Sequence, residues 1–136
     1  MPIQIMAMRH GICHVPEVGA IMRNDIDSYS NSVATNPAAR DMMFRNLLLE
    51  CCATENGDVY DRLVRAKNVF RQFSPSILEA IARQPELRIP KILELVKHLF
   101  MSEGAPLLNH DDASLRHGTA ACFDVLGISN TKSRAQ

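Results

Sequence analysis

Capping residues and prolines divide the middle of the chain, residues 36–104, into consecutive amphipathic segments. Asn36-Pro37 has the form of a helix start, because asparagine caps free N–H groups and proline at the first helical position lacks an N–H that would be unpaired anyway. Pro90 begins another segment, and Gly104 ends it. Between these signals the apolar residues recur every three or four positions, which is typical of helices rather than strands. The pattern predicts an all-α fold.

Three segments precede the one at Pro90. We expect the first helix to run from residue 36 to Asn56-Gly57, with the glycine in a left-handed C-terminal position. The third of these predicted helices begins at Ser74-Pro75 and ends before Pro85. The second helix is predicted between them, because apolar residues recur there at spacings of four, three, four and three and would form one apolar face: Val59, Leu63, Ala66, Phe70 and Phe73.

The N-terminal part is less regular. Residues 2–8 fit a short strand or an extended arm, and residues 9–14 fit a turn. Pro16 then leads a stretch whose apolar side chains recur at helical spacing: Val18, Ile21, Met22, Ile26 and Tyr29. This stretch predicts a further helix before the central run.

A last helix is expected after Asp111 or Asp112, either of which is a suitable N-cap, with its end at Gly127. The chain is therefore predicted to be a compact bundle of five to six helices with a short extended N-terminal arm as an option. Residues 1–129 form the expected single domain, and residues 130–136 form a frayed tail.

Composition narrows the class of protein. The chain has 136 residues, and its hydrophobic content of 46% is typical of a globular domain. Charges interrupt every apolar run before the roughly 20 residues that a membrane helix needs, and the first residues lack the features of a secretory signal. Four cysteines, two of them adjacent, do not form a disulfide framework. We expect a cytoplasmic protein, with delivery as a signal-peptide-independent effector left open.

Charge is unevenly distributed although the formal net charge is zero. Residues 1–61 hold four basic and eight acidic side chains, a net charge of −4, whereas residues 62–97 hold eight basic and three acidic side chains, a net charge of +5. Such a basic segment is one form of nucleic-acid surface, with Arg62, Arg65 and Lys91 as candidate contacts. No phosphate-binding loop or nucleic-acid motif accompanies it. A solvated helix face is the favoured interpretation, and nucleic acid is not the expected partner.

Arg9-His10-Gly11 follows an apolar, strand-like run. This short stretch is similar to the opening of the histidine phosphatase family, in which a strand ends in Arg-His-Gly. The resemblance implies that His10 would be a phosphate-accepting nucleophile and Arg9 a phosphate ligand. The same family requires an α/β sheet, which the helical pattern of the central residues does not favour. Histidine-dependent phosphotransfer is thus an alternative hypothesis.

Histidine and cysteine side chains also permit a metal-site hypothesis. His10, Cys13 and His14 lie within five residues, and His117 lies near the other end of the chain. Imidazole and thiolate groups are the ligands that zinc prefers in tetrahedral sites. A site would form only if the two ends of the chain met. Without that meeting, we expect no cofactor.

The adjacent pair Cys51-Cys52 is a third candidate for chemistry. Two neighbouring side chains on a helix cannot point into the same core, so we expect one buried and one edge cysteine. A nucleophilic thiol would need a nearby base, and no pattern in the sequence supplies one. Structural cysteines are the favoured interpretation.

The methionines suggest an interaction role. The chain has seven, and Met42, Met43 and Met101 lie in segments that are already strongly apolar. Methionine is common on adaptable binding surfaces, although the same residues also suit a core. We therefore predict a protein–protein interaction or adaptor module, including the small effector and inhibitor classes, without catalytic activity. The candidate partner-binding residues are Met42, Met43, Met101, Arg62 and Arg65, and a homodimer is one expected arrangement.

Overall fold

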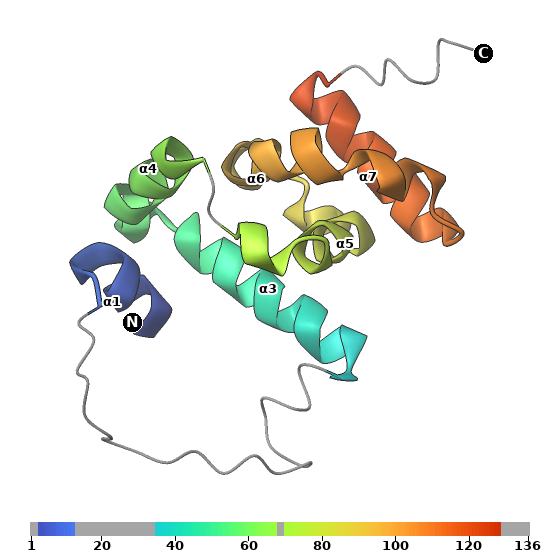
Figure 1. Ribbon diagram of the computed structural model, residues 1–136. Helices are drawn as coiled ribbons and strands as arrows, with labels where there is room; N and C mark the ends of the chain where they lie inside the picture. Colours follow the sequence, from blue (N-terminus) through green and yellow to red (C-terminus); the bar gives the residue numbers. More distant parts are fainter. Residues whose placement is uncertain (1–2, 13–34, 68–69, 129–136) are drawn as a thin grey trace.

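The computed structural model describes residues 3–12, 35–67 and 70–128, and none of these residues forms a β-strand. The described chain contains six α-helices (Figure 1), which confirms the prediction of an all-α bundle. Their bounds are α1 Ile3–His10, α3 Pro37–Cys51, α4 Gly57–Ala66, α5 Ser76–Arg83, α6 Pro90–Glu103 and α7 Ala113–Leu126. Four 3-10 turns connect them: η1 Thr54–Asn56, η2 Arg71–Phe73, η3 Pro85–Leu87 and η4 Ala105–Asn109. No described helix has both the length and the apolar character needed to cross a bilayer.

The start of α3 follows the predicted capping chemistry. The Asn36 side chain accepts hydrogen bonds from the backbone N–H groups of Ala38 at 3.0 Å and Ala39 at 3.4 Å. The predicted end of this helix is wrong, because α3 stops at Cys51. Gly57 has φ −56°, so it is a right-handed residue that begins α4 rather than a left-handed cap of α3. The Asn-Gly pair therefore joins two helices.

The long stripe predicted from Val59 to Phe73 is also interrupted. Helix α4 ends at Ala66, because Lys67 takes the left-handed conformation with φ 58°, and Phe70 takes it again with φ 64°. Two left-handed residues so close together cannot continue a right-handed helix. Phe70 is buried, but Phe73 is 42% exposed and packs edge-on against Phe44, with ring centroids 5.9 Å apart.

The second half of the chain follows the predicted bounds closely. Helix α5 ends before Pro85, and α6 begins at Pro90 and closes at Gly104. Asp112 caps α7 by accepting a hydrogen bond from the Ser114 N–H at 2.9 Å. Left-handed Gly127, with φ 67°, terminates that helix as expected.

Helices α5 and α7 approach each other closely at Gly118. A Cβ atom added to Gly118 would lie 2.0 Å from the carbonyl oxygen of Ala82 and 2.8 Å from the Ala82 Cα. These are backbone atoms, which cannot move aside without shifting α5. The absence of a side chain at this position is what permits the two helices to approach so closely.

One hydrophobic cluster takes side chains from all six described helices. Helix α6 lies centrally and contributes fully or almost fully buried residues along most of its length. Phe100 packs edge-on against Phe123 of α7, with ring centroids 6.0 Å apart. Representative buried members from the other helices are Ile5, Leu48, Val59, Ile77 and Cys122.

The strand or extended arm predicted over residues 2–8 is wrong. Residues 3–8 belong to α1, and Ile5 is completely buried in the hydrophobic cluster. A lone strand would leave its N–H and C=O groups without partners, whereas a helix pairs them internally. The helix predicted after Pro16 and the tail predicted over residues 130–136 lie outside the described residues, and the domain division stays a prediction.

Candidate functional site

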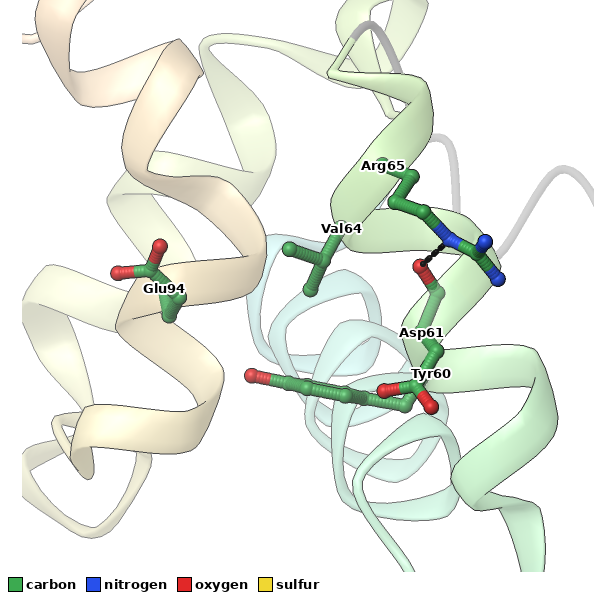
Figure 2. A pocket seen from close by; sticks show the side chains of 5 residues that line it. All are labelled: Tyr60, Asp61, Val64, Arg65 and Glu94. Carbon is green, nitrogen blue, oxygen red and sulfur yellow. Dashed lines mark hydrogen bonds between the residues drawn. The ribbon is translucent and has the colours of Figure 1, made fainter.

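A shallow, open groove of about 410 Å³ lies between α4 and α6. It is lined by Tyr60, Asp61, Val64, Arg65 and Glu94 (Figure 2). Tyr60 and Val64 point from α4 toward α6, whereas Arg65 lies along the outer side of α4. The Arg65 Nε donates to the backbone oxygen of Asp61 at 3.2 Å. The groove therefore offers a small apolar floor between charged side chains.

The phenol of Tyr60 is hydrogen-bonded to the backbone of α6, which forms one side of this groove. Its hydroxyl donates to the backbone oxygen of Lys91 at 2.7 Å, and the Lys91 Nζ lies 4.9 Å from the ring centroid. Burial, followed by nearby Cys52, Glu94 and Asp61, raises the pKa of Tyr60. A hydrogen-bonded, protonated phenol is a poor base or nucleophile.

Several cations of the basic segment are engaged within the fold. Arg62 donates from Nη1 to the backbone oxygen of Arg9 at 2.7 Å, and Lys91 donates from Nζ to the backbone oxygen of Cys52 at 2.8 Å. Arg83 pairs with Asp41 at 3.2 Å. Arg62 and Arg65 share helix α4, but only Arg65 lines the groove. Of the three candidate contacts, Arg65 lines the groove and Lys91 lies over the Tyr60 ring, whereas Arg62 is bound to α1.

Arg9 is the centre of a polar junction between α1, α3 and α4. Its Nε and Nη2 donate to the two carboxylate oxygens of Asp58 at 2.8 and 3.0 Å, and Nη2 also donates to Asn56 Oδ1 at 3.0 Å. Asn56 is almost fully buried and donates from Nδ2 to the backbone oxygen of Glu50 at 2.8 Å. The Arg9 hydrogen bond holds the pKa of Asp58 down at about 2.

This junction changes the interpretation of the Arg9-His10-Gly11 motif. The motif lies at the C-terminal end of α1 rather than after a strand, and Gly11 is left-handed with φ 82°. Arg9, the supposed phosphate ligand, is occupied by Asp58 and Asn56. His10 is exposed at the helix end. The described residues therefore do not reproduce the strand-end geometry that the phosphatase resemblance implied.

The proposed metal ligands are distributed over distant elements. His10 lies at the end of α1 and His117 lies on α7, and these helices are at opposite sides of the bundle (Figure 1). Cys13 and His14 lie outside the described residues. Within the described ranges, no three histidine, cysteine or acidic side chains are grouped as a metal site requires. The structure does not bring His10 and His117 together.

The three described cysteines agree with a structural role. Cys51, the last residue of α3, is fully buried and Cys52, its C-cap, is half-buried, which agrees with the prediction of one buried and one edge cysteine. Burial raises the pKa of the Cys51 thiol to about 12, and it raises that of Cys52 and of Cys122 to about 11. Thiols with such pKa values hold very little of the reactive thiolate at neutral pH.

The candidate methionines lie on two helices. Met42 on α3 is 54% exposed and Met101 on α6 is 65% exposed, whereas Met43 is half-buried and packs on the core. Together with Arg62 and Arg65 on α4, the five candidate partner-binding residues are spread over three helices.

Helix α3 also exposes two apolar side chains away from the core, with Arg45 and the exposed Asn46 between them. Phe44, Leu48 and Cys51 point into the core. Met42 and Leu49, which are two helical turns apart, lie on the opposite face, and Leu49 is 39% exposed. The sequence interpretation missed Leu49, although its spacing of seven residues from Met42 was a usable signal. We call Met42 and Leu49 the outer face of α3.

No family model, curated protein or solved structure matches this chain. The case for function therefore depends on the chemistry of these surfaces.

Proposed function

We propose that the chain is a protein–protein interaction module that binds its partner through the outer face of α3 and has no catalytic activity of its own. The observation that supports this proposal most is the exposure of Met42 and Leu49 on the side opposite Phe44 and Leu48. Covering exposed apolar side chains lowers the free energy of a complex. A helix that exposes two large apolar side chains on its solvent side is suited to receiving a second surface.

The chemical groups of the chain support binding over catalysis. The described thiols are buried with raised pKa values, and the Tyr60 hydroxyl is engaged in a hydrogen bond. Methionine has three rotatable bonds and a polarizable sulfur, so Met42 can adapt to differently shaped partners. A small adaptor, effector or inhibitor would use such a face, and a second copy of this chain is one candidate partner.

Site-specific photocrosslinking tests this proposal. A photoreactive side chain replaces Met42, and the same group replaces Ala120, an exposed residue of α7, in a control chain. We expect an intermolecular crosslink from position 42 that the substitution Leu49→Gln removes. The matched substitution Val125→Gln, at a residue of α7 that is 54% exposed, should leave the crosslink intact.

Identification of the crosslinked peptides decides the outcome. A crosslink to a different protein or to a second copy, lost with Leu49→Gln, would support the proposal. Crosslinks that join position 42 only to residues of its own chain, such as residues 13–34, would contradict it. Equal crosslinking from positions 42 and 120 would also contradict it, because the capture would not depend on the outer face of α3.

A further inference from the structure

We draw no further inference here: the strongest candidate, the shallow groove between α4 and α6, is lined by the acidic Asp61 and Glu94 together with the basic Arg65, and with this mixed charge nothing in the structure shows what covers it.

Discussion

At the scale of single residues, several polar and thiol side chains of the described chain contact other helices of the same chain. Arg9 joins helices through Asp58 and Asn56 instead of presenting a free guanidinium. Tyr60 uses its hydroxyl to hold α4 against α6. Cys51 is fully buried and packs as a small apolar side chain. Arg9, Tyr60 and Cys51 thus each take part in holding the described helices together.

Asp58 gives a prediction about pH. Its pKa of about 2 in the folded protein lies below the value of about 3.9 for an unperturbed aspartate, so its pairing stabilises α1 docking above pH 4. That contribution is lost as the pH falls from about 4 through 2. Carbon-detected NMR of the side-chain carboxyl should show titration near pH 2, moving toward 4 in Arg9→Ala. An unchanged titration in that variant would contradict the assigned cause, and Arg45→Ala, which removes an arginine that pairs with Glu86 instead, is the control.

The thiols give a second prediction. At pH 8, iodoacetamide should modify Cys51 and Cys122 in the folded protein far more slowly than in the same protein unfolded by guanidinium chloride, because burial raises their pKa and blocks access. Peptide mass spectrometry over a time course measures both rates. Rapid modification of either cysteine in the folded chain would show that its helix opens readily.

At the scale of helices, close packing and capping account for the arrangement. Helices α5 and α7 meet where Gly118 lies against the Ala82 backbone, and α7 is bounded by the Asp112 cap and left-handed Gly127. Helix α3 is different, because it divides its apolar side chains between the core and the solvent. The contact between α5 and α7 and the two sides of α3 each give a prediction about stability.

Two glycines provide a matched pair. Gly118→Ala should lower the free energy of unfolding by about 1–3 kcal/mol or more, because the new methyl group meets backbone atoms of Ala82. Gly57→Ala places a methyl group in open space at a right-handed position, so it should be neutral or stabilising by up to about 1 kcal/mol. Urea unfolding measures both. Equal effects would contradict the close approach of α5 and α7.

The two faces of α3 should separate stability from binding. Leu48→Ala removes a fully buried side chain and should lower the free energy of unfolding by about 2–5 kcal/mol. Met42→Gln changes an exposed side chain and should alter it by no more than about 0.5 kcal/mol. Urea unfolding of both variants tests this difference. A large loss from Met42→Gln would mean that the rest of the chain covers this face.

At the scale of the whole molecule, local signals predicted most of the fold. The Asn36-Pro37 start, the Pro90 and Gly104 bounds and the Gly127 end all agree with the structure. These signals act within one helical turn, so the sequence displays them directly. The interruption at Lys67 was not predictable in this way, because no glycine marks the left-handed position.

The contacts that define the candidate surfaces were harder to predict. Arg9 and Asp58 are 49 residues apart, and only the folded chain places them together. The short α1 was mistaken for a strand because an apolar run of this length fits either period. Exposure of Leu49 depends on which side of α3 the other helices cover. Long-range packing decides all three features.

The packing of the whole bundle predicts an order of local opening. Amide hydrogens of α1 should exchange faster than those of α5 and α6, because α1 has few buried contacts and docks at the edge of the bundle. Arg9→Ala should accelerate exchange in α1 while leaving α6 nearly unchanged. Hydrogen exchange with NMR detection tests both statements. Equal protection of α1 and α6 would show that α1 unfolds only with the whole molecule.

The buried amide of Asn56 has one more consequence. It contacts Arg9 through its oxygen and the Glu50 backbone through its nitrogen, so one side chain links the end of α3 to α1 at the start of α4. Perturbations at Arg9 and Asn56 therefore cannot be independent. In a double-mutant cycle their energetic penalties should be non-additive, since whichever side chain is removed first already breaks the bond that the second would have contributed.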